Sequence, residues 1–168
     1  GEERLLALQA ESSQTAQETF SVLTNVDLDF GRVDTPEGPR ALSQSTFSSL
    51  LQSADRDVRR RAYLQFYGAY EAHKTTIAQL YAGSCKQDKY RAQVRNFPSA
   101  RAAALFPDDV GKEVYDNLVA TVNANLPTLH RYYELRRKAL SVPELRHYDV
   151  YVPLVPAAII FDLGLGDP

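Results

Sequence analysis

The sequence predicts a mainly α protein: a multi-helix, bundle-like lobe of long amphipathic helices with one small β-hairpin. Three observations favour this class. Apolar residues recur every three or four positions over most of the chain, which is the period of an amphipathic helix. Strict alternation occurs in a single short stretch, followed by a Pro- and Gly-rich turn. Hydrophobic residues make up 44% of the 168 residues, which is enough to bury a core.

The first 42 residues predict an entry helix followed by a hairpin. Residues 2–23 are expected to be helical because Leu5, Leu8, Phe20 and Leu23 fall near one helical face. Residues 26–30 alternate apolar and acidic side chains, which is typical of a half-buried strand. Residues 35–39 read Thr-Pro-Glu-Gly-Pro and predict a turn, after which residues 40–42 pair back.

Two N-caps mark the next helices. Ser43 is expected to cap a short helix, and Asp55 a long helix that runs to about Ala82. One continuous buried stripe follows the long helix: Val58, Ala62, Phe66, Ala69, His73, Ile77 and Leu80. Tyr63, Tyr67 and Tyr70 form a second stripe. A further helix is expected around Tyr90, and Ser99 can cap an Ala-rich turn.

The last long helix is expected to open at Pro107, with two aspartates in its first turn. Its apolar stripe is Val110, Val114, Leu118 and Val122. Pro127 should kink the helix or split it in two. Residues 136–138 are basic, the sign that suits a helix C-terminus, and Pro143 should end the helix.

Composition excludes several classes of protein. Cys85 is the single cysteine, so an internal disulfide is impossible and a reducing compartment is expected. No stretch resembles a signal peptide, and the apolar residues 150–165 are too short and too rich in proline to cross a membrane. The chain begins with Gly1 and has no methionine, so we expect a processed or cut chain that need not be a whole protein.

The residues present do not predict a complete catalytic site. Zinc hydrolases often carry H-E-x-x-H, but no two of His73, His130 and His147 are four residues apart. His130 and Glu134 could supply two metal ligands, fewer than a structural site requires, and are expected to be an exposed polar pair. Cys85 lies about 18 Å along a helix from His73, which excludes that pairing. We therefore expect neither catalytic nor metal-ligating residues in this chain.

Charge is distributed unevenly along the chain. Residues 56–101 contain ten basic and three acidic residues, a net charge of +7, whereas the whole chain carries −2. Arg59, Arg60 and Arg61 and their aromatic neighbours resemble the mix used by nucleic-acid binders. The overall charge and the helical spacing favour a solvated or docking face instead, so we do not expect a nucleic-acid partner.

Ordered segments of the chain resemble the oligoendopeptidase F family, relatives of thimet oligopeptidase among the zinc metallopeptidases. The matching segments are residues 20–31 (FSVLTNVDLDFG), 53–59 (SADRDVR), 67–70 (YGAY) continuing to 76–78 (TIA), 114–118 (VYDNL), 129–136 (LHRYYELR) and 147–154 (HYDVYVPL). The resemblance covers about residues 5–155. It is carried by the ordered set, because no single segment is diagnostic.

The resemblance implies a fragment or truncated homologue of a cytoplasmic, zinc-dependent enzyme that hydrolyses short peptides. It divides the chain into an entry helix (1–24), a helical lobe with the hairpin (25–106), the first helices of a catalytic domain (107–154) and a divergent tail (155–168). The family's H-E-x-x-H helix is absent, so this chain is expected to be inactive alone. His147, Tyr148 and Tyr151 are expected to line the substrate cleft.

A non-catalytic module for protein interaction or self-association is the alternative. Apolar residues at the end of the chain would then lack partners and favour a homo-oligomer: Leu154, Ile159, Ile160 and Phe161.

Overall fold

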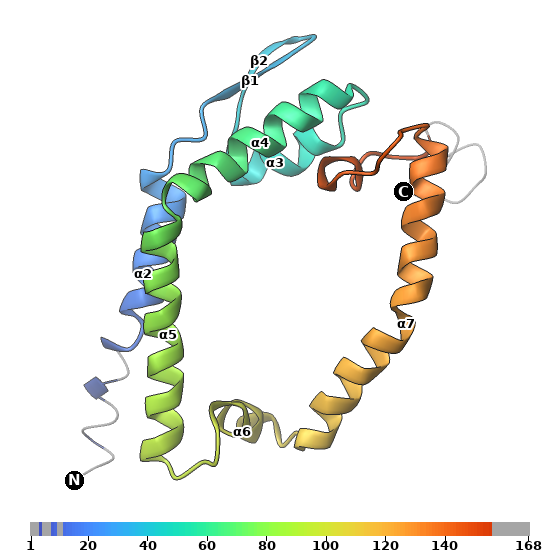
Figure 1. The fold of residues 1–168 in the computed structure, drawn as a ribbon. Coiled ribbons are helices and arrows are strands. Elements are labelled where there is room, and N and C mark those ends of the chain that lie inside the picture. The colour runs from blue at the N-terminus through green and yellow to red at the C-terminus, as the bar shows by residue number, and fades with distance from the viewer. Residues whose placement is uncertain (1–3, 5–7, 10–11, 156–168) are drawn as a thin grey trace, which may run out of the picture. The chain divides into compact units, whose positions relative to one another are not determined.

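The structure is a computed structural model that describes residues 4, 8, 9 and 12–155. Contacts divide the chain into two compact units, unit 1 from residues 1–29 and 69–124 and unit 2 from residues 30–68 and 125–168. Helices dominate, and the described residues contain one two-stranded antiparallel sheet (Figure 1). The mainly α class with one hairpin is therefore confirmed. None of the described helices is both long and apolar enough to cross a membrane.

Unit 1 holds α2 (Thr15–Val22) and α5 (Lys74–Val94), which lie side by side (Figure 1). The predicted strand at residues 26–30 is wrong. The end of α2 widens into a π-helical turn (Leu23–Asp27), in which the Leu28 N–H donates to the Leu23 carbonyl at 2.9 Å. This local hydrogen bonding replaces the expected ladder. Leu5, which belongs to the predicted entry helix, lies outside the described residues. A turn at residues 13–14 interrupts that predicted helix just before α2.

Unit 2 begins with the hairpin, β1 (Arg32–Thr35) and β2 (Gly38–Ala41), in which Val33 pairs with Arg40. The hairpin is confirmed, although its first strand lies six residues later than expected. Residues 36–37 form the turn, and Gly38 has a φ of +113°, which glycine adopts without a Cβ clash.

Both N-caps in unit 2 are confirmed. Ser43 accepts from the Thr46 N–H at 3.2 Å and caps α3 (Gln44–Leu51). The Asp55 carboxylate accepts from the Asp57 N–H at 2.8 Å at the start of α4 (Arg56–Ala72). The expectation that this helix runs to Ala82 is wrong, because His73 (φ −115°, ψ 11°) separates α4 from α5. His73 is exposed, so the buried stripe ends before it.

The hydrophobic core of the described residues lies mainly in unit 2, where α3, α4, the hairpin and the segment after α7 meet. Its buried apolar residues are Phe30, Val33, Leu42, Leu50, Leu51, Val58, Ala62, Phe66, Val142 and Val152. This core gives α3 and α4 a fixed framework from which further side chains project.

The chain continues through α6 (Ala100–Leu105), capped by Ser99 as predicted, into α7 (Lys112–Ala139). α7 starts at Lys112 and not at Pro107, because Asp109 is left-handed (φ 51°) and ends a short 3₁₀ turn (Phe106–Asp108). Pro127 does not split the helix. The basic last turn is confirmed, and Ser141 (φ 53°) follows the helix end before Pro143.

Candidate functional site

A loop of residues 142–152, which contains a short 3₁₀ turn (His147–Asp149), is fixed in unit 2 by a buried carboxylate. Asp149 is fully buried and lies 2.9 Å from Arg59 Nη2 and 2.8 Å from Arg56 Nη2. Burial by itself would raise the pKa of Asp149, but hydrogen bonds from Arg56, the Arg146 N–H and Arg59 outweigh it and hold that pKa below its ordinary value. Asp149 is therefore ionised at neutral pH, and it ties the loop to α4.

Arginines also bind the carbonyl groups of this loop. Arg136 Nη2 donates to the carbonyls of Asp149 at 3.1 Å and Val152 at 2.6 Å. The other donors are Arg59 to Tyr148 O (3.1 Å), Arg56 to Glu144 O (3.1 Å) and Arg137 to Val142 O (3.2 Å). Two arginines from α4 and two from α7 thus satisfy backbone groups that no secondary structure satisfies. We call Arg56, Arg59, Arg136, Arg137 and Asp149 the loop clamp.

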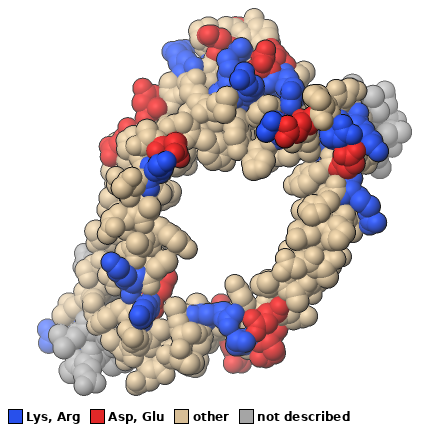
Figure 2. Space-filling view, viewed as in Figure 1, with Lys and Arg blue, Asp and Glu red and all other residues tan. Residues whose placement is uncertain are grey.

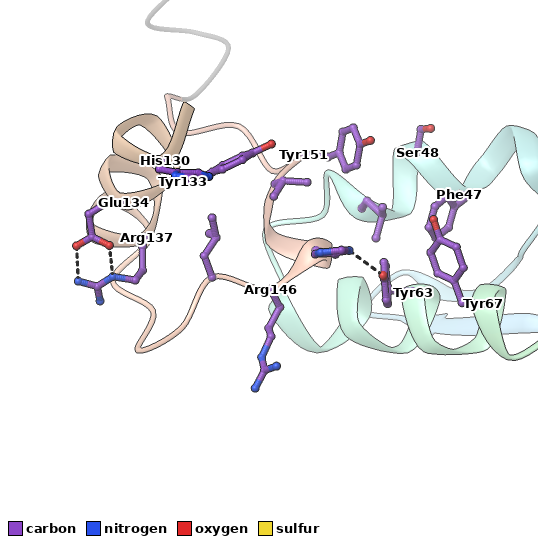
Figure 3. Close-up of a pocket in the computed structure, with 14 residues that line it drawn as sticks. Phe47, Ser48, Tyr63, Tyr67, His130, Tyr133, Glu134, Arg137, Arg146 and Tyr151 are labelled. Carbon is purple, nitrogen blue, oxygen red and sulfur yellow. Dashed lines mark hydrogen bonds and ion pairs between the residues drawn. The ribbon is translucent and has the colours of Figure 1, made fainter. Parts of the chain in front are cut away.

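The clamped loop forms part of a pocket of about 690 Å³ that lies wholly within unit 2 (Figure 3). Its lining comes from α3, α4, the C-terminal half of α7 and the loop. The lining residues are Phe47, Ser48, Leu51, Tyr63, Tyr67, His130, Tyr133, Glu134, Arg137, Leu145, Arg146, His147, Val150 and Tyr151. A volume of this size is typical of small-ligand pockets, roughly 300–1,000 Å³.

Of the three residues predicted to line a substrate cleft, the pocket contains two. His147 and Tyr151 line it, and His147 Nδ1 lies 3.1 Å from the Tyr63 hydroxyl (Figure 3). Tyr148 is outside the lining, because its ring lies beneath the Arg56 guanidinium at 5.3 Å. Burial, and then the neighbouring Tyr67, raise the pKa of Tyr63, so its hydroxyl stays protonated at neutral pH. Contact of these residues with a substrate stays a prediction.

The residues described by the structure do not fit a zinc site. They contain no cluster of three or more His, Cys, Asp or Glu side chains placed to hold a metal ion. Glu134 is instead paired with Arg137 through two hydrogen bonds of 2.8 Å, and this hydrogen bonding lowers the pKa of Glu134. Cys85 and His73 are both exposed.

The basic stretch at residues 56–101 serves several different contacts. Arg59 is 3% exposed and belongs to the loop clamp, whereas Arg60 and Arg61 are exposed, as predicted. On the face shown in Figure 2, most basic groups lie beside acidic ones.

Sequence reasoning missed the clamp role of Arg56, Arg59, Arg136 and Arg137. The one feature of the sequence that could have indicated the loop clamp is Asp149, an acidic residue in a stretch rich in apolar and aromatic residues.

Comparison with known proteins establishes the class. Residues 49–158, about two thirds of the chain, match the model of Peptidase family M3, and the chain belongs to this family.

Individual relatives give a more specific comparison than the family model. The chain is 41% identical to Oligopeptidase PepF of Bacillus subtilis over 158 residues, covering 94% of this chain and 24% of that protein. It is 42% identical to Group B oligopeptidase PepB of Streptococcus agalactiae, with 91% and 26% covered. The crystal structure of oligoendopeptidase-F from Enterococcus faecium superposes with a TM-score of 0.89 at 38% identity, covering 96% of this chain and 32% of that one. The chain thus spans about a quarter of the length of the curated relatives it matches.

Proposed function

We propose that this chain is the helical part of a zinc-dependent oligoendopeptidase that hydrolyses short peptides in the cytoplasm. The observation that carries the proposal is identity of about 40% to relatives named oligopeptidase or oligoendopeptidase over more than nine tenths of the chain. In this proposal, zinc and the catalytic groups belong to a part of the enzyme outside this chain. The chain alone is then inactive, and its boundaries at residues 24, 106 and 154 separate the entry helix, the lobe and the first catalytic-domain helices.

Within that enzyme, we assign the unit 2 pocket to peptide contact. His147 and Tyr151 face the peptide, and Tyr148 acts behind them by stacking against Arg56. Two features support this assignment. The pocket walls are rich in aromatic side chains, which carry much of the binding energy at many interfaces. The loop clamp also holds one wall rigidly, so little ordering is needed on binding.

Two preparations test the proposal. The first is the chain itself, assayed with Zn²⁺ and a quenched-fluorescence short peptide; we expect no turnover. The second is a chimera in which this chain replaces the matched 158 residues of Bacillus subtilis PepF; we expect cleavage that a chelator abolishes. Chelator-sensitive turnover by the chain alone would show that it holds its own catalytic site. A chimera that folds by circular dichroism but cleaves no peptide would contradict the assignment to this enzyme.

A self-association module is the second candidate, favoured by one surface. Val114, Leu118 and Val122, which belong to the predicted apolar stripe of α7, are 53–60% exposed, and Val119 is 45% exposed. Contiguous apolar surface of this kind is typical of contact sites. Analytical ultracentrifugation of the chain tests it: a concentration-dependent dimer that Leu118→Glu abolishes supports self-association, and a monomer at all concentrations excludes it. The tail residues Ile159, Ile160 and Phe161 lie outside the described residues.

A further inference from the structure

We propose that the unit 2 pocket selects a large uncharged side chain of a bound peptide, preferably an aromatic one. The inference rests on the proposed peptide-binding function and adds to it a specificity and the residues that determine it. It is carried by three observations on the described residues: a rigid aromatic wall, a clamped opposite wall, and ionic groups that are already paired at the edge.

The first wall comes from α3 and α4. Phe47 lies against Tyr67 edge to face, with ring centroids 5.9 Å apart, and Tyr67 lies 4.6 Å from Tyr63. Phe47 is also stacked on the buried Phe66 at 4.0 Å, and Phe66 is stacked on Phe30 at 4.7 Å. Because the lining rings rest on a core stack, the wall keeps its shape before any ligand arrives, which lowers the entropic cost of binding.

The opposite wall comes from α7 and the clamped loop. Tyr133 and His130 belong to α7 (Figure 3). Val150 and Tyr151 directly follow the buried Asp149 in the sequence. The Tyr63–His147 hydrogen bond joins the two walls. An aromatic side chain placed between them can make edge-to-face contacts on both sides, the geometry that aromatic pairs prefer.

Charged groups of the lining are already neutralised. Glu134 and Arg137 bind each other, and Arg146 Nη2 lies 2.5 Å from Glu144 Oε2. In Figure 3 the Glu134–Arg137 pair lies at the edge, and the Arg146 side chain points away from Tyr133 and Tyr151. A lysine or glutamate side chain entering the pocket would lose water without gaining a free counter-charge, which is costly.

Several polar groups remain for the peptide backbone. Among the described residues, the side chains of Ser48, His130 and Tyr151 have no hydrogen-bond partner, and all three line the pocket. They can donate to or accept from the amide groups that flank a bound side chain. The pocket therefore combines an apolar centre with a few polar groups that set orientation, as ligand sites usually do.

The absence of tryptophan from the chain makes the test direct, because emission from a tryptophan peptide then reports only the ligand. The probe is acetyl-Gly-Gly-Trp-Gly-Gly-amide titrated with the 168-residue chain, with Leu, Lys and Glu versions of the peptide as competitors. We expect saturable binding of the Trp peptide, weaker competition by Leu, and none by Lys or Glu.

Two pocket variants locate the site. Tyr151 is 60% exposed, so Tyr151→Ala should fold normally and weaken binding about fivefold. Ser48→Arg, also at an exposed position, places a cation in the lining and should abolish binding. The matched control is Tyr81→Ala, which removes a 73% exposed tyrosine from α5 in unit 1 and should leave binding unchanged.

The outcomes separate this inference from the proposed function. Equal competition by the Lys and Trp peptides, no binding of the Trp peptide, or equal binding by wild type, Tyr151→Ala and Ser48→Arg would each overturn the inference. If the chimera cleaves peptides and Tyr151→Ala leaves its preference unchanged, the inference fails while the proposed function stands. If the chain binds the Trp peptide at the pocket and the chimera is inactive, the proposed function fails instead.

Discussion

Arg59 and Asp149 form a buried ion pair, 2.9 Å long, between residues 90 positions apart in the sequence. Their side chains are 3% and 0% exposed. The pair attaches the loop that carries His147 and Tyr151 to α4, so the position of one pocket wall depends on it. A buried ion pair need not stabilise the fold more than apolar residues placed at both positions. Removing only one partner, however, leaves the other charge buried and uncompensated, which destabilises the fold.

Asp149→Asn is therefore expected to lower the free energy of unfolding by about 3–5 kcal/mol, because the buried Arg59 is left without its anion and the partly exposed Arg56 also loses its partner. Urea denaturation followed by circular dichroism measures the change. Asp116→Asn is the matched control: Asp116 also binds two cations, Arg101 and Lys112, but at the surface, so its loss should matter far less. Equal effects of the two substitutions would contradict a special role for Asp149.

Acid should destabilise the wild type partly through Asp149. Its pKa in the folded state lies below the unfolded value of about 3.9, so its stabilising contribution is present above that value and is lost as pH falls through the folded pKa. We expect the stability difference between wild type and Asp149→Asn to be constant near neutral pH and to shrink below about pH 4. Urea midpoints measured from pH 2 to pH 7 check this. A difference independent of pH would show that Asp149 is not the titrating group.

Local sequence signals predicted most helices and the hairpin. The Ser43 and Asp55 caps and the turn at residues 36–37 depend on residues close in sequence, and each lies where expected. Two errors have local causes, the π-helical turn (Leu23–Asp27) and the left-handed Asp109, and others arose where distant packing decides the outcome. His73 continues the helical spacing, yet it is exposed and marks a helix break. The α7 stripe has the period of a buried face, but a period does not reveal whether a partner covers it.

The site was less predictable than the fold for the same reason. His147 and Tyr151 came from a family resemblance, and the pocket contains both. Its other wall, Phe47, Tyr63 and Tyr67, comes from helices more than 60 residues away in sequence. Arg136 looked like a favourable charge at a helix C-terminus, whereas its guanidinium binds two backbone carbonyls of the loop. Sequence spacing does not encode such long-range contacts.

Arg136→Lys should loosen the loop while preserving charge. Lysine lacks the planar fork with which Arg136 reaches the Asp149 and Val152 carbonyls and the Tyr132 hydroxyl. We expect faster amide exchange in residues 144–152 and little change in α3. Arg131→Lys on the same helix is the control, because Arg131 is exposed and its side chain bonds only to Thr128 among the described residues. Unchanged exchange in the loop of Arg136→Lys would contradict the clamp role of the guanidinium.

Pro127→Ala should stabilise the protein. Helix α7 runs unbroken from Lys112 to Ala139 with Pro127 inside it, although proline lacks the N–H that an interior helical position would donate. Because the helix already tolerates the proline, alanine should restore the missing hydrogen bond and gain up to about 3 kcal/mol in unfolding free energy. Urea denaturation measures this gain, and ellipticity at 222 nm reports helix content. Pro143→Ala, beyond the helix end, should produce no comparable gain. Stability unchanged or lowered by Pro127→Ala would mean that the surrounding structure requires the proline geometry at this position.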